Sequence, residues 1–216
     1  MISPEQYTDI QIIKKILAGE TALYEIIIRR YNPYLYKTGR SYNYNHEDTQ
    51  DLMQDTFIDA YKNLSGFEGR ASFKTWVTKI MLNHCYRKKQ KLSFKNEITR
   101  DVNEYAQPMF TSANNDIHKI VQSRELSYTI EEALSKIPLE YRMVFSLREI
   151  NGFNVAETAK LLEITETNVK VRLNRARTML RKEIEKKYSA DDIFEFNLIY
   201  CDAIVKNVLQ SVSGLE

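Results

Sequence analysis

Acidic side chains gather in one short stretch of the chain, and basic side chains gather in two others. Residues 46–61 read HEDTQDLMQDTFIDAY and contain no Lys or Arg. Asp51, Asp55 and Asp59 recur every four residues, so a helix would place them on one stripe, with no base in the stretch to offset their repulsion. Such a stripe is either a solvated face or a docking surface for a basic protein partner.

The first basic segment mixes cations with aromatic residues. Residues 70–91 read RASFKTWVTKIMLNHCYRKKQK and follow a loop with glycines at 66 and 69. Cations bind phosphates, and aromatic faces stack on unpaired bases, so the mixture favours single-stranded nucleic acid. Trp76 by itself fits an ordinary core position equally well.

The second basic segment has the pattern of a helix-turn-helix. A short helix from Val155 to Leu162, a turn at 163–165 and a second helix to Arg181 match the sequence VAETAKLLEITETNVKVRLNRARTMLR. The buried stripe of the second helix is predicted to be Val169, Leu173, Ala176 and Leu180. The opposite face, which suits a major groove, carries Asn168, Val171, Asn174 and Arg175, and Lys170 and Arg172 flank it.

The composition predicts the elements that must position these residues. The chain has 216 residues, 43% of them hydrophobic, with only 6 Gly and 4 Pro, which favours helices. We expect an all-α protein of two small helical domains joined by a flexible linker. The expected parts are 1–92, a linker at 93–116, 117–187 with the helix-turn-helix, and an amphipathic extension at 188–216.

Local signals place the first helices. Gly19 is expected to end one helix, and Asn32-Pro33 to bend the chain at the next boundary. A helix over 48–64 and a long helix from an N-cap at Ser72 to about Leu92 should follow.

Other classes of protein find little support. The histidines at 46, 84 and 118 are scattered, neither Cys85 nor Cys201 has a CxxC partner, and no Gly-rich phosphate loop occurs. We therefore expect no enzyme, no metal site and no cofactor. No apolar run spans a bilayer and no signal peptide is seen, so we expect a cytoplasmic protein without membrane insertion.

Taken in order, the motifs resemble those of a known family. The chain resembles the extracytoplasmic-function (ECF) group of bacterial sigma factors over residues from about 20 to 187. The motifs that carry the resemblance are, in order, DLMQDTF, FEGRASFKTW, a polar linker, IPLEYRMVFSLREINGFNVAETAKLL and ETNVKVRLNRAR. The resemblance implies two helical domains, called region two and region four, that bind core RNA polymerase and promoter DNA and promote strand opening. An anti-sigma factor is a further partner that the family implies.

The resemblance also implies roles for individual residues. The polymerase-binding residues would be Asp51, Gln54 and Asp55, which gives the acidic stripe a basic protein partner. The minus-ten element would be bound by Phe67, Arg70, Ser72, Phe73, Lys74, Trp76, Lys79, Asn83, Arg87 and Lys88. The minus-thirty-five element would be read by Lys170, Val171, Arg172, Asn174 and Arg175.

The sequence departs from the family at the turn of the helix-turn-helix and extends beyond the shared domains. Glu163 stands where relatives usually have Gly, so we expect a strained or altered backbone there. In the tail, the spacing predicts an apolar helix face that either packs on region four or serves regulation, made of Cys201, Ile204, Val205, Val208 and Val212.

Two rival functions remain open. One is a stand-alone helix-turn-helix regulator, and the other is a metal-dependent nuclease or transposase fragment that would bind its metal through Asp51 and Asp55.

Overall fold

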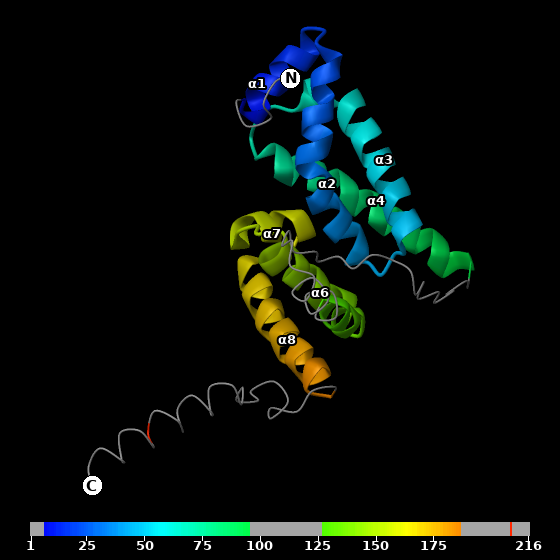
Figure 1. Cartoon of the computed structure of the whole chain (residues 1–216), viewed down its shortest axis with the longest axis vertical. Coiled ribbons are helices and arrows are strands. Elements are labelled where there is room, and N and C mark those ends of the chain that lie inside the picture. Colours follow the sequence, from blue (N-terminus) through cyan, green and yellow to red (C-terminus); the bar gives the residue numbers. More distant parts are fainter. Residues whose placement is uncertain (1–6, 96–126, 187–207, 209–216) are drawn as a thin grey trace. The chain divides into compact units, whose positions relative to one another are not determined.

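A computed structural model describes residues 7–95, 127–186 and 208. All regular structure in these ranges is helical, which confirms the predicted all-α class (Figure 1). The chain divides into two compact units, Met1–Leu180 and Arg181–Glu216. The predicted linker at 93–116 and the predicted extension at 188–216 lie almost wholly outside the described residues, so the domain boundaries stay predictions.

The first helices begin and end at local signals in the sequence. α1 (Asp9–Leu17) opens with a capping box, in which the Thr8 hydroxyl accepts from the Gln11 backbone N–H while the Gln11 side chain accepts from the Thr8 backbone N–H. The helix stops before Gly19, whose φ of 109° suits glycine. A short 3₁₀ turn, η1 (Thr21–Leu23), then leads into the second helix.

α2 (Tyr24–Arg40) runs straight through Pro33, so the predicted helix boundary at Asn32-Pro33 is wrong. Proline inside a helix removes one backbone hydrogen bond and costs about 3 kcal/mol. On the same helix, Ile27 and Tyr31 are buried before Pro33, and Leu35 is buried after it. Burial of these large apolar side chains offsets that cost, at about 1.5–3 kcal/mol each.

The next two helices complete the first core. α3 (His46–Lys62) is capped by Asn45, and α4 (Phe73–Lys95) follows the 3₁₀ turn η2 (Leu64–Gly66). The Ser72 hydroxyl accepts a hydrogen bond from the Thr75 N–H at 3.1 Å, which confirms the predicted N-cap. α2, α3 and α4 pack against one another around Ile27, Leu35, Leu52, Val77, Met81 and Cys85 (Figure 1).

Two buried features show how tightly these three helices pack. A Cβ atom added at Gly39 would lie 2.6 Å from Thr49 Cγ2 and 2.9 Å from Met81 Cε. The glycine therefore lets α2 approach α3 and α4 closely. Cys85 is fully buried, and its burial raises the pKa of the thiol to about 12.

The later helices form the predicted helix-turn-helix and its support. Residues 127–135 are helical, and α6 (Leu139–Phe145) continues into a π-helical turn, η3 (Ser146–Ile150). α7 (Val155–Leu162) and α8 (Glu166–Glu185) follow, with Val144, Ala159, Val169 and Leu173 packed between the elements. α7 has the predicted bounds, and Val169, Leu173 and Ala176 of the predicted α8 stripe are buried. The fourth predicted member, Leu180, is only half-buried.

Candidate functional site: protein-binding and nucleic-acid-binding surfaces

The acidic stripe of α3 divides into exposed and paired members. Asp51, Gln54 and Asp55 are exposed, and no ion pair of Asp51 or Asp55 occurs among the described residues. Asp48 instead pairs with Lys88, and the Asp59 carboxylate accepts a hydrogen bond from Nε2 of the His84 ring at 3.0 Å; both partners lie on α4. The expectation that no base offsets these acids is wrong for Asp48, because sequence spacing along α3 could not show the Lys88 partner on another helix.

The loop before α4 ends in a cluster of three aromatic rings. The ring centroids of Phe67, Phe73 and Trp76 lie 5.3–5.4 Å apart. Phe73 is 1% exposed and forms the interior of the cluster, whereas Phe67 and Trp76 are half-buried. Arg70 is exposed and pairs with Glu68. The buried ring of Phe73 thus supports the partly exposed rings of Phe67 and Trp76.

The polar α4 side chains that were predicted to bind DNA fall into two groups. Lys74 donates to the backbone carbonyl of Asn151 and lies 4.0 Å from the Tyr34 ring centroid, and burial lowers the pKa of its amine. Lys79 donates to the Glu163 carboxylate at 2.6 Å and to the Leu161 carbonyl at 3.2 Å. Three residues predicted to bind the minus-ten element, Lys74, Lys79 and Lys88, thus already have partners within the chain.

Asn83 and Arg87 make up the second group of α4 side chains. Both are exposed, and neither forms a hydrogen bond or an ion pair within the described part of the chain. They lie one helical turn apart, so they share a face of α4. This face offers an amide and a guanidinium that are free to meet a ligand.

A buried arginine that the sequence analysis did not single out joins the early and late helices of the first unit. Arg142 on α6 donates to the carbonyl of Ser41 at 2.6 Å and to those of Leu134 and Ser135 at 3.2 and 2.8 Å. Burial lowers the pKa of its guanidinium to about 10. The sequence signal was only a basic residue at a core position of α6, which spacing alone does not distinguish from a surface cation.

Near Arg142, apolar contacts join the same helices. Leu82 of α4 packs with Met143, Leu147, Phe153 and Leu161. The charged and apolar contacts together bind α2 and α4 to α6, η3 and α7.

Of the two outcomes expected at the turn of the helix-turn-helix, a strained or an altered backbone, the structure has the strained one. Glu163 ends α7 with φ 55° and ψ 44°, in the left-handed region. Such a conformation costs an L residue about 1–2 kcal/mol. The hydrogen bond from Lys79, followed by its positive charge, lowers the pKa of the Glu163 carboxyl.

The outward face of α8 carries the predicted base-reading residues. Lys170, Val171, Asn174 and Arg175 are exposed, with 42% of Val171 accessible, and Arg172 is half-buried. The Thr165 hydroxyl accepts from the Asn168 N–H at 3.2 Å and caps the helix. Cations, an amide and an aliphatic tip on one helix face match the donors and apolar contacts that a major groove offers.

Two conserved-region models of one family match the chain, region 2 of Sigma-70 over residues 27–94 and region 4 of Sigma-70 over residues 128–180. The chain belongs to the sigma-70 family, in its ECF group. The resemblance predicted from the sequence is thereby confirmed. Since sigma factors are transcription initiation factors, this sigma factor acts in transcription initiation.

Two curated relatives illustrate the sequence similarity of this sigma factor to other members of the group. It is 28% identical over 178 residues to the ECF RNA polymerase sigma factor SigW of Bacillus subtilis, covering 80% of this chain and 94% of that one. It is 24% identical over 178 residues to the ECF RNA polymerase sigma factor SigM of Mycobacterium tuberculosis, covering 81% and 84%.

Two solved structures share the fold of this sigma factor. The sigma factor RpoE in complex with the anti-sigma factor NepR from Bartonella quintana has a TM-score of 0.59 at 20% identity, covering 75% of this chain and 96% of that one. CnrH in complex with the cytosolic domain of CnrY has a TM-score of 0.58 at 21% identity, covering 83% and 99%.

No helix within the described ranges combines the length and apolar character needed to cross a membrane. Over the same part of the chain, no group of three or more His, Cys, Asp or Glu side chains is placed to hold a metal ion.

Proposed function

We propose that this sigma factor binds core RNA polymerase through Asp51, Gln54 and Asp55 on α3. The observation that carries the proposal is the division of the acidic stripe. Asp48 and Asp59 are used inside the fold, while Asp51 and Asp55 are exposed without an ion pair in the described part of the chain. Unpaired acids on a rigid helix favour a basic partner, since charge complementarity sets orientation and the rate of association.

The minus-ten element of the promoter is bound by the aromatic cluster and by α4. Phe67 and Trp76 offer ring faces beside a glycine-containing loop, and Phe73 supports them from the core. Extruding a base costs a few kcal/mol, so a pocket whose rings are already held in place lowers the cost of strand opening. Asn83 and Arg87 contact the adjacent DNA. Opening is driven by binding energy, with no bond made or broken by this chain.

The minus-thirty-five element is read by α8. Arg175, Asn174 and Lys170 supply donors, and Val171 supplies an apolar contact for a thymine methyl group. The capping of α7 and α8 and the burial of Val169 and Ala176 hold this face in place. Arg172, which was also predicted to read this element, is half-buried, and its guanidinium is proposed to contact a phosphate at the edge of the groove.

An anti-sigma factor is a further proposed partner. The two solved structures with the same fold, RpoE with the anti-sigma factor NepR and CnrH with the cytosolic domain of CnrY, are both complexes. A pull-down from cells of the source organism, with this sigma factor as bait, should recover a protein that blocks its transcription in vitro. Recovery of polymerase alone would count against this partner.

Transcription with purified components tests the main proposal. Core polymerase that lacks sigma should start at specific promoters only when this chain is added. The double variant Asp51→Lys/Asp55→Lys should lose polymerase binding, measured without DNA by anisotropy of a labelled chain. Glu140→Lys, an exposed acid on α6, is the matched control and should bind normally.

The same experiment separates the rival function of a stand-alone regulator. A regulator that acts without polymerase would bind duplex DNA specifically while failing to bind polymerase at moderate salt. That result would overturn the proposal. The exposed acids of α3 favour the sigma role, because duplex binding alone gives them no use.

A further inference from the structure

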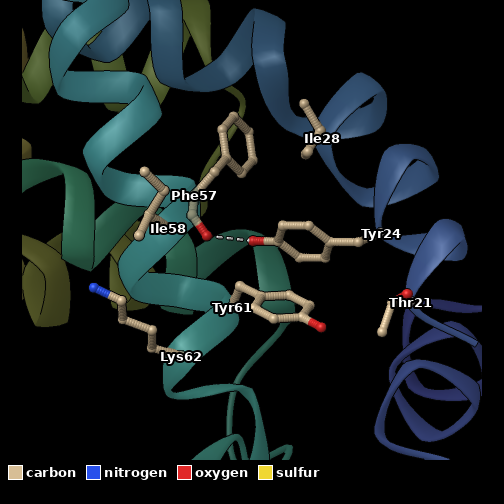
Figure 2. Close-up of a pocket in the computed structure, with 7 residues that line it drawn as sticks. All are labelled: Thr21, Tyr24, Ile28, Phe57, Ile58, Tyr61 and Lys62. Atoms are coloured by element: carbon tan, nitrogen blue, oxygen red, sulfur yellow. Dashed lines mark hydrogen bonds between the residues drawn. The ribbon is translucent and has the colours of Figure 1, made fainter. Parts of the chain in front are cut away.

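An apolar pocket lies between the beginning of α2 and the end of α3 (Figure 2). Its cavity volume is about 410 Å³, and it is lined by Thr21, Tyr24, Ile28, Phe57, Ile58, Tyr61 and Lys62. Most of these side chains are aliphatic or aromatic. The pocket is therefore suited to an apolar group of a ligand rather than to a charged one.

The walls of the pocket are fixed before any ligand binds. The Tyr24 hydroxyl donates to the Phe57 carbonyl at 2.7 Å, and the Tyr24 and Tyr61 rings meet edge to face with centroids 5.0 Å apart (Figure 2). Burial raises the pKa of Tyr24, so its phenol stays neutral. A preformed cavity spares a ligand the entropic cost of ordering its site.

Two large apolar side chains at the pocket are left at the surface. Ile58 is 51% exposed and Tyr61 is 39% exposed, and both belong to α3. Exposed apolar groups beside a cavity are a frequent feature of protein-binding surfaces.

The pocket is continuous with the acidic face of α3. Asp51, Asp55 and Ile58 follow one another at i, i+4 and i+7 and so share one side of the helix. At 1.5 Å per residue, the distance along the axis from Asp51 to Ile58 is about 10 Å, or two helical turns. One short helix of a partner can therefore reach both the acids and the pocket.

The positive charge of Lys62 restricts which way a basic partner helix can run along this surface. Lys62 stands at the far rim of the pocket, one turn beyond Ile58 and two turns beyond Asp55. A partner helix with cations over Asp51 and Asp55 would meet a like charge if it continued as a basic helix over Lys62. The surface thus fits a helix whose basic residues come at one end and whose large apolar side chain comes next.

We propose that the pocket binds one large apolar side chain, of Leu, Met or Phe, from the same basic polymerase helix that pairs with Asp51 and Asp55. This inference rests on the proposed polymerase binding. The acids determine the rate and orientation of the encounter, and the pocket determines how long the complex lasts.

Truncation of one exposed isoleucine tests the inference. Ile58→Ala should weaken the binding of core polymerase by about tenfold, as expected for an apolar anchor of an interface. Ile10→Ala is the matched control, because Ile10 on α1 is 54% exposed. It should change the affinity by less than about twofold, in the range of near-neutral contacts. Both side chains are exposed, so thermal unfolding should show that both variants fold normally.

Salt separates the two parts of the surface. The loss caused by Asp55→Ala should shrink as salt increases, because salt screens exposed charges, whereas the loss caused by Ile58→Ala should persist. Normal polymerase binding by Ile58→Ala, together with lost binding by Asp51→Lys/Asp55→Lys, would overturn the proposed role of the pocket and leave the proposed polymerase binding standing. Absence of binding by the unaltered chain would overturn both. Self-association of the unaltered chain that Ile58→Ala abolishes would assign the pocket to a second copy and overturn the inference.

Discussion

Single residues in this sigma factor depart from what local preference would select, and Glu163 and Gly39 do so in opposite ways. Glu163 adopts a backbone conformation that glycine would adopt without strain. Gly39 lies inside α2, where alanine would be the better helix former. In each case tertiary contacts explain the choice, because Glu163 meets Lys79 and Gly39 meets Thr49.

Glu163→Gly is expected to be more stable than Glu163→Gln. Glycine relieves left-handed strain of about 1–2 kcal/mol but loosens the unfolded chain by about 0.4–1 kcal/mol. The expected gain over Glu163→Gln, which removes the charge and keeps the strain, is therefore roughly 0–1.6 kcal/mol, with a mid-range value of about 0.8 kcal/mol. Urea unfolding measures the difference. Lower stability of Glu163→Gly than of Glu163→Gln would show that the left-handed turn is not strained.

Gly39→Ala is expected to destabilise the chain in spite of the higher helix propensity of alanine. Its Cβ would lie 2.6 Å from Thr49 Cγ2, so the packed side chains must shift. Overpacking of this kind costs about 1–3 kcal/mol, which exceeds the propensity gain of about 1 kcal/mol at the upper end of that range. Thermal unfolding provides the measurement. Gly66→Ala, with no atom within 4 Å of the added Cβ, is the control and should be nearly neutral.

At the scale of the helix, the sequence predicted what is encoded locally. The bounds of α7, the Ser72 cap and the exposed position of Val171 follow from capping residues and helical periodicity. The helix boundary at Pro33 was wrong, because burial on either side of it outweighed a local signal. The pairing of Asp48 with Lys88 joins residues 40 positions apart, so no spacing within α3 predicts it.

Arg175→Ala should test α8 as a base reader. Arg175 is exposed, and its closest partner, the Tyr141 hydroxyl, lies 3.4 Å away. Loss of a base contact should cost about 1–3 kcal/mol on a specific promoter and relax the preference at one position. Arg177→Ala is the control, since Arg177 pairs with Glu149 at 2.7 Å and should matter less. Equal loss on random DNA would reduce Arg175 to a phosphate contact.

At the scale of the first compact unit, contacts between residues far apart in sequence tie the early helices to the later ones. Arg142 holds the Ser41 carbonyl, Lys79 holds Glu163, and Leu82 packs into a cluster with Phe153. Side chains assigned to DNA by the sequence, Lys74 and Lys79 among them, take part in these contacts. Promoter binding through these two lysines therefore requires that their present contacts be exchanged.

Arg142→Ala should reveal whether the unit unfolds as one. The change removes a buried cation from three carbonyls, at a cost of about 2–4 kcal/mol for hydrogen bonds to a charged group and their desolvation. The chain has a single Trp, at position 76 on α4, which reports on the early helices. Its fluorescence in a urea titration should shift to a lower midpoint. An unchanged midpoint would show that the early helices unfold independently of α6.

The buried thiol of Cys85 can report how often the core of the first helices opens. Only the ionised sulfur attacks disulfide reagents, and a thiol with a pKa of about 12 is neutral and shielded while the core stays closed. In a chain carrying Cys201→Ser, the rate of labelling by a thiol reagent would count the openings of the α2–α4 core. The same burial means that oxidants in the cell meet this sulfur only when the helices part.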